Sequence, residues 1–112
     1  MANLAPVVLK HYDLILWMFP KISKFPRDHK FLLGDRIENL LLDILKNLMT
    51  ANYQPSTRVK NLTDVNLMLD YLRILTRLCK DLNFFNNKEY EFQAKAVDEI
   101  GRMVGGWARA QK

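Results

Sequence analysis

Residues 61–82, NLTDVNLMLDYLRILTRLCKDL, decide the fold. Apolar side chains recur in them at alternating steps of three and four residues, a period that fits one face of a helix and not the alternation of a strand. This row, called the seam below, consists of Val65, Met68, Leu72, Leu75, Cys79 and Leu82. A seam of this kind is typical of helix bundles. The pattern predicts a helix over residues 61–83.

The same helix carries a second apolar row on the flank next to the seam. This second row consists of Leu67, Tyr71, Ile74 and Leu78. One neighbouring helix cannot cover both rows, and an uncovered apolar patch of this size marks an interface. Two interpretations stay open: the helix is central in the monomer, or the second row is a subunit interface.

Three other segments have the helical period. Pro6 suits a first helical turn and Pro20 and Pro26 end or kink the segment, which predicts a helix over residues 5–22. Apolar residues at steps of three and four predict a second helix over 29–52, and Asn86 offers the N-cap of a fourth over 87–110. The sequence predicts an all-α fold, an up-down antiparallel four-helix bundle in a single domain over residues 1–112.

Composition excludes several classes of protein. The chain has 112 residues, of which 49% are hydrophobic, so it can bury a core. Its one cysteine, Cys79, cannot form an intrachain disulfide, and a reducing, cytoplasmic location fits best. The most apolar stretch, residues 14–19, is shorter than the roughly 20 residues of a membrane span. We therefore expect no membrane span and no signal peptide.

Catalytic and metal-binding patterns are not found. Neither His11 nor His29 follows a glutamate by three residues, as the di-iron bundle motif requires. Cys79 lies in the seam, where a cysteine packs as a small apolar side chain. The residues indicate a protein that is not an enzyme, with no cofactor and no small-molecule substrate. A small metalloenzyme is the contrary hypothesis, and metal analysis of the purified protein would test it.

Charge is more informative. The formal net charge is +5. Arg73, Arg77 and Lys80 follow one another at steps of four and three, so they share one helical face, although Asp70 and Asp81 lie within pairing distance. A solvated helical surface is one interpretation of these charges. Binding to the phosphates of a nucleic acid is the other.

Three glycines near the C-terminus, Gly101, Gly105 and Gly106, call for an explanation, because each costs a helix about 1 kcal/mol relative to alanine. Fraying of the last turns is one reading. Close approach of another backbone, with Trp107 filling the adjacent space, is the other.

Four stretches together resemble a known family. They are HYDLILW (11–17), KFPR (24–27), FLLGDRIEN (31–39) and DEIGRMVGGW (98–107). In this order they are similar to the accessory variability determinant (Avd) proteins of diversity-generating retroelements, which are bacterial, archaeal or phage-encoded. These belong to a wider group of small four-helix proteins that includes those encoded in ribosomal-RNA intervening sequences.

The resemblance implies a non-catalytic accessory protein that binds the retroelement reverse transcriptase and the template-repeat RNA through a basic surface. It supports mutagenic reverse transcription and retrohoming, by which a target gene is diversified. The resemblance also implies a barrel-like homo-oligomer, a homopentamer. The alternative is a structural or interaction bundle of the intervening-sequence type, without a reverse transcriptase partner.

The resemblance also suggests site residues. For contact with RNA or reverse transcriptase they are Arg73, Arg77 and Lys80, to which we add Arg58 and Lys60 and the loop group Lys24, Arg27 and Lys30. For the oligomer interface they are Leu67, Tyr71, Ile74, Leu78, Gly101, Gly105, Gly106 and Trp107.

Overall fold

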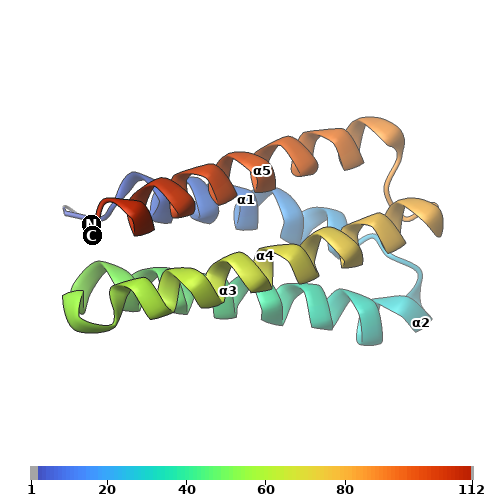
Figure 1. Cartoon of the computed structure of the whole chain (residues 1–112). Coiled ribbons are helices and arrows are strands. Elements are labelled where there is room, and N and C mark those ends of the chain that lie inside the picture. The colour runs from blue at the N-terminus through green and yellow to red at the C-terminus, as the bar shows by residue number, and fades with distance from the viewer. Residues whose placement is uncertain (1–2, 112) are drawn as a thin grey trace.

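The computed structural model describes residues 3–111 and contains four long helices (Figure 1). These are α1 (Pro6–Ile22), α3 (Asp35–Tyr53), α4 (Arg58–Asp81) and α5 (Asn87–Arg109). They form a rod of 44 × 23 × 21 Å, in which successive long helices run in opposite directions. Residues 3–111 hold no strand. The prediction of an all-α four-helix bundle is confirmed.

Each helix packs against two others. α4 lies between α3 and α5, and α1 closes the bundle between α5 and α3. Figure 1 shows the chain termini and the α3–α4 connection at one end of the rod, called the termini end below. The α1–α2 and α4–α5 connections lie at the opposite end, called the turn end.

The segment predicted as one helix over 29–52 begins earlier and is not uniform. A single turn, α2 (Arg27–His29), leads into a π-helical turn, η1 (Lys30–Gly34), before α3 starts. The wider turn directs Gly34 into the core, where an added Cβ would lie 2.9 Å from Cγ2 of Ile22. It also leaves Phe31 and Leu32 exposed. Glycine therefore makes the close contact between this segment and α1 possible.

The helix predicted over 61–83 is α4, which begins at Arg58 and ends at Asp81. A 3-10 turn, η2 (Pro55–Thr57), leads into it because proline supplies the first-turn backbone angle without needing a hydrogen bond. The helix ends earlier than predicted because Asn83 adopts a φ of 65°, a left-handed conformation that asparagine tolerates better than most residues. Asn86 then caps α5, as predicted, and it also forms a capping box with Glu89.

The seam of α4 is only partly the buried face. Val65, Leu72 and Cys79 are fully buried, but Leu82 is 42% exposed. Leu75 is buried as well, whereas Met68 is only half-buried, and Leu69 and Thr76, which lie outside the seam, join the buried face. The hydroxyl of Thr76 is accommodated by donating a hydrogen bond to the carbonyl of Arg73. Apolar patterning could not identify a core threonine.

Candidate nucleic-acid interface

The three basic residues of α4 are brought together with three acids. Arg73 donates from Nη1 to Asp70 at 2.8 Å and from Nε to Asp98 of α5 at 3.2 Å. Arg77 pairs with Asp81 at 3.2 Å. The positive charges of the two arginines are therefore compensated locally, and Arg73 links α4 to α5.

Lys80 completes this face without an ion pair among residues 3–111. Its ammonium lies 5.0 Å from the ring centre of Tyr90, a cation–π contact. The predicted trio thus lies along the α4–α5 boundary with Asp70, Asp81 and Asp98 beside it. Three carboxylates balance three cations, so this surface offers alternating charge rather than a positive field.

The guanidinium of Arg58 is engaged in contacts within the chain and is not free in solvent. Its guanidinium donates to the carbonyls of Ala51 and Asn52 at 2.6 and 3.1 Å, and to Oε1 of Gln111 at 3.2 Å. It also lies over the ring of Trp107 at 5.4 Å. These contacts join the end of α3, the start of α4 and the end of α5. Arg58 closes the termini end, so its charge is already engaged within the chain.

Lys60, the residue predicted with it, is more exposed but paired. Its ammonium contacts Asp64, one turn further along α4, at 2.9 Å. An exposed pair of this type contributes little stability and exchanges readily with water or other anions.

The loop group is different, because Lys24, Arg27 and Lys30 form no ion pair within the described part of the chain. Lys24 lies in the α1–α2 connection, Arg27 in α2 and Lys30 in η1. Asp28 is the one acid among residues 23–31, so this segment carries a net positive charge. The turn end therefore holds the strongest free cationic group among the predicted sites.

Aromatic packing fixes this loop. The ring of Phe84, from the α4–α5 connection, lies 5.2 Å from that of Phe25 and 4.9 Å from that of His29. Phe85 is buried beside Phe25, at 5.6 Å between ring centres. Because these rings close the turn end, its cations are not needed to hold the two connections together.

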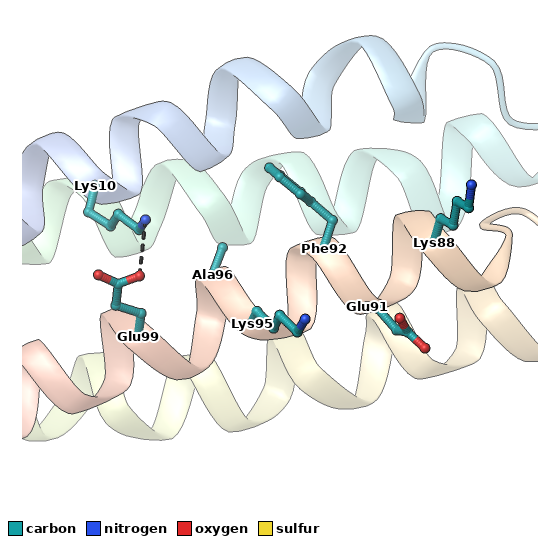
Figure 2. Close-up of a pocket in the computed structure, with 7 residues that line it drawn as sticks. All are labelled: Lys10, Lys88, Glu91, Phe92, Lys95, Ala96 and Glu99. Carbon is teal, nitrogen blue, oxygen red and sulfur yellow. Dashed lines mark ion pairs between the residues drawn. The ribbon is translucent and has the colours of Figure 1, made fainter.

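A groove between α1 and α5 contains residues that sequence reasoning missed. It has a volume of about 370 Å³ and is lined by Lys10, Lys88, Glu91, Phe92, Lys95, Ala96 and Glu99. Figure 2 shows Phe92 reaching from α5 toward α1, with Lys88 on one side and the Lys10–Glu99 ion pair on the other. The one sequence signal was a phenylalanine between two lysines seven residues apart, which apolar periodicity does not distinguish from packing.

The second row of α4 is exposed. Leu67 is 72% exposed and Ile74 is 68% exposed, while Tyr71 and Leu78 are also open to solvent. The interpretation that a central position of the helix in the monomer covers this row is therefore wrong. The other interpretation, a subunit interface, stays a prediction.

The glycines of α5 lie within an intact helix, since α5 continues to Arg109. The fraying interpretation is therefore wrong for Gly101, Gly105 and Gly106. A Cβ at 101 would meet the guanidinium of Arg73 at 3.0 Å, and one at 105 would meet that of Arg109 at 3.3 Å. No backbone of another helix in residues 3–111 approaches these positions within 4 Å, so close approach by a second copy stays a prediction.

The interior offers little chemistry. Burial raises the pKa of the Cys79 thiol to about 12, so it is protonated at neutral pH and is a poor nucleophile. His11 is buried and its Nε2 lies 2.8 Å from the carbonyl oxygen of Leu41, while desolvation lowers its pKa. Residues 3–111 contain no group of three metal-ligating side chains. No helix in that range has the length and apolar character needed to cross a bilayer.

A family model described as bAvd-like matches residues 7–111. No curated protein and no solved structure matches the chain.

Proposed function

This chain belongs to the bAvd-like family, and we propose that it is a non-catalytic accessory protein of a diversity-generating retroelement. It binds the retroelement reverse transcriptase and the template-repeat RNA, and it supports mutagenic reverse transcription and retrohoming. The observation that carries this proposal is the family match, which extends over residues 7–111. The chemistry of the enzyme stays with the reverse transcriptase.

The distribution of charge supports a role for the turn end in RNA binding. Lys24, Arg27 and Lys30 form no ion pair within residues 3–111, so a phosphate need not displace one. Neutralising phosphates with such side chains releases counterions and makes binding steeply salt-dependent. We assign the RNA backbone to this group first.

The α4 face suits the protein partner better. Arg73 and Arg77 are held by Asp70, Asp98 and Asp81 at 2.8–3.2 Å. On a surface of alternating charge, these arginines and aspartates can form new ion pairs with oppositely charged residues of a protein partner. Such a surface selects a partner by its charge pattern. We assign Arg73, Arg77 and Lys80 to contact with the reverse transcriptase.

Self-association completes the proposal. The second row is exposed in the single chain, and Gly105, Gly106 and Trp107 are half-buried, so a second copy would bury the second row and cover what remains exposed of the other three. The expected assembly is a barrel-like homopentamer. Five copies at +5 each would carry a formal charge of +25, which strengthens the field for RNA phosphates. The free, buried thiol of Cys79 is compatible with a cytoplasmic location.

The test is co-purification with the reverse transcriptase encoded at the same locus, with and without template RNA, across a salt series. We expect a stable complex whose affinity for RNA falls steeply with salt. Lys24→Glu with Arg27→Glu should weaken RNA binding, whereas Arg73→Glu with Arg77→Glu should weaken enzyme binding. A matched control, Lys46→Glu with Arg102→Glu, makes the same charge change elsewhere on the surface and should leave both largely intact.

The alternative function is a structural bundle of the intervening-sequence type. It predicts a folded oligomer that binds neither reverse transcriptase nor template RNA at any salt concentration. That result would replace our proposal with the alternative.

A further inference from the structure

We propose that the groove between α1 and α5 binds an unpaired base of a single-stranded RNA. The base stacks on the exposed side of Phe92, and its neighbouring phosphates lie at Lys88 and Lys95. This inference rests on the proposed function, since it gives the RNA of that proposal a definite binding place. It lies outside every residue group predicted from the sequence.

The first support is a preformed aromatic platform. Phe92 is 55% exposed, although its ring stacks on Trp17 of α1 with centres 4.8 Å apart and planes at 29°. Trp17 is itself half-buried against Phe85 and lies under the ammonium of Lys21 at 5.3 Å. The Phe92 ring is thus supported by Trp17 on one face, and its other side is open to solvent. Aromatic side chains presented in this way bind bases by stacking without regard to sequence.

The second support is the charge beside the ring. Lys88 precedes Phe92 by four residues and Lys95 follows it by three, so all three lie on one side of α5. The rise of 1.5 Å per residue separates the two lysines by about 10 Å along the axis. Neither forms an ion pair within residues 3–111. Two cations therefore flank one exposed ring.

The acids of the groove do not cancel this charge. Glu99 is bound to Lys10 at 3.1 Å and is neutralised there. Glu91 is the remaining acid of the lining, and Figure 2 shows its carboxylate projecting away from the Phe92 ring. The lining counts three lysines against two glutamates, which favours an anionic occupant.

The shape of the groove favours a single strand over a duplex. A volume of about 370 Å³ lies within the roughly 300–1,000 Å³ range of ligand sites, enough for one nucleotide-sized group. Ala96, one turn after Phe92, keeps the adjacent wall low. A paired base has its faces covered by its neighbours in the stack, so a base must be splayed out to reach the ring.

The experiment measures fluorescence anisotropy of a labelled 12-nucleotide single-stranded RNA, and of the same RNA annealed to its complement. Phe92→Ala should weaken single-strand binding about 5- to 150-fold, the range expected for loss of one base–aromatic stack, and leave duplex binding unchanged. Phe92→Tyr should retain the affinity. Tyr53→Ala, which removes another exposed aromatic ring at the termini end, is the matched control and should have no effect.

The lysines give a second readout. Lys88→Gln with Lys95→Gln should reduce the slope of log affinity against log salt by about 1.4, because each lost single-strand phosphate contact contributes about 0.7. Circular dichroism and sedimentation of each variant report folding and assembly.

Two results would overturn the inference. One is a Phe92→Ala protein that binds single strands like the wild type, and the other is a Phe92→Ala protein whose oligomer mass changes, which would make the groove a subunit contact. If that variant still co-purifies with reverse transcriptase and RNA, the proposed function stands without this groove. If the wild type binds neither partner, the proposed function fails first.

Discussion

At the termini end, one guanidinium joins three helices; at the turn end, a cluster of rings joins two connections. Arg58 contacts Ala51 of α3, Gln111 just after α5 and the ring of Trp107 in α5. Phe25 and Phe84 pack together at the other end, with ring centres 5.2 Å apart. Both ends are rich in basic residues in the sequence, yet one uses its arginine for structure and the other leaves its cations unpaired.

The difference teaches that a basic residue is available to bind a partner only where other side chains hold that end of the bundle together. Aromatic packing buries apolar area and leaves nearby ammonium and guanidinium groups in water. Where a basic side chain itself holds the helices together through hydrogen bonds, its N–H groups are no longer free to bind phosphate. The ends can therefore be compared by what each loses when its closing residue is removed.

The largest effect is expected at the turn end. Phe85 is 2% exposed, and Phe85→Ala should lower the free energy of unfolding by about 3–5 kcal/mol, since it deletes a buried ring and leaves a cavity. Urea unfolding followed by circular dichroism measures it. Phe31→Ala, at a residue 66% exposed in the same region, should change stability by less than about 0.5 kcal/mol. Equal losses for the two variants would contradict an aromatic closure centred on Phe85.

Next comes the guanidinium of the termini end. Arg58→Met keeps much of the aliphatic stem but removes the hydrogen-bond donors to Ala51 and Asn52. It should lower the free energy of unfolding by about 1.5–3 kcal/mol. Arg58→Lys should recover only part of this loss, because one ammonium cannot reproduce the fork of donors. Lys60→Met is the control, with a loss below about 1 kcal/mol for its exposed pair. Full recovery by lysine would mean that charge alone closes this end.

The glycine contact beside η1 gives a smaller effect. Gly34→Ala would bring a Cβ to 2.9 Å from Cγ2 of Ile22, and should cost about 1–3 kcal/mol through overpacking. Ile22→Leu moves the branch away from Cβ and should reduce that cost in a double-mutant cycle. In Gly101→Ala the new Cβ would meet the end of the Arg73 side chain at 3.0 Å and Cδ1 of Leu69 at an ordinary 4.0 Å, so the variant should be neutral or stabilise the protein by up to about 1 kcal/mol. A destabilised Gly101→Ala monomer would show that the guanidinium cannot give way.

Midway between the ends, His11 makes stability depend on pH. Its pKa is lowered in the folded state by desolvation, so below an unfolded pKa of about 6.5 the unfolded chain binds more protons and the fold loses stability as pH falls. The slope cannot exceed about 1.4 kcal/mol per pH unit for this one proton. His11→Gln should remove its contribution to the slope between pH 7 and pH 5 in urea titrations. An unchanged slope would assign the acid sensitivity to other groups.

The smallest effect on stability is expected from the free cations. Lys24→Ala, Arg27→Ala and Lys30→Ala should each change the free energy of unfolding by less than about 0.5 kcal/mol. Each should nevertheless lower the salt slope of single-strand RNA binding by about 0.7 for a lost phosphate contact. Stability by urea unfolding and affinity by anisotropy separate the two quantities. A large stability loss would show that these cations also close the turn end.

Sequence reasoning identified the residues that define the bundle. The apolar period located Val65, Leu72 and Cys79 in the core, and the capping pattern located the start of α5 at Asn86. The second apolar row was also visible in the sequence, but its exposure was shown only by the structure. All these features depend on neighbours within one or two helical turns, so local geometry determines them.

The candidate site was less accessible to sequence reasoning. The basic residues could be counted, but pairing of Arg73 with Asp98 spans 25 positions and engagement of Arg58 with Gln111 spans 53. The Trp17–Phe92 platform likewise joins the first and last long helices.

By itself, the sequence determined four amphipathic helices, their approximate ends and a surplus of positive charge. Only the tertiary structure decided which cations are engaged, that Gly34 faces Ile22, and that the stacked ring of Phe92 stays exposed beside two lysines. The physical reason is that helical periodicity assigns each side chain to a face through local backbone geometry. The rotation and height of each helix against its neighbours, set by packing of the whole core, then decide what that face meets.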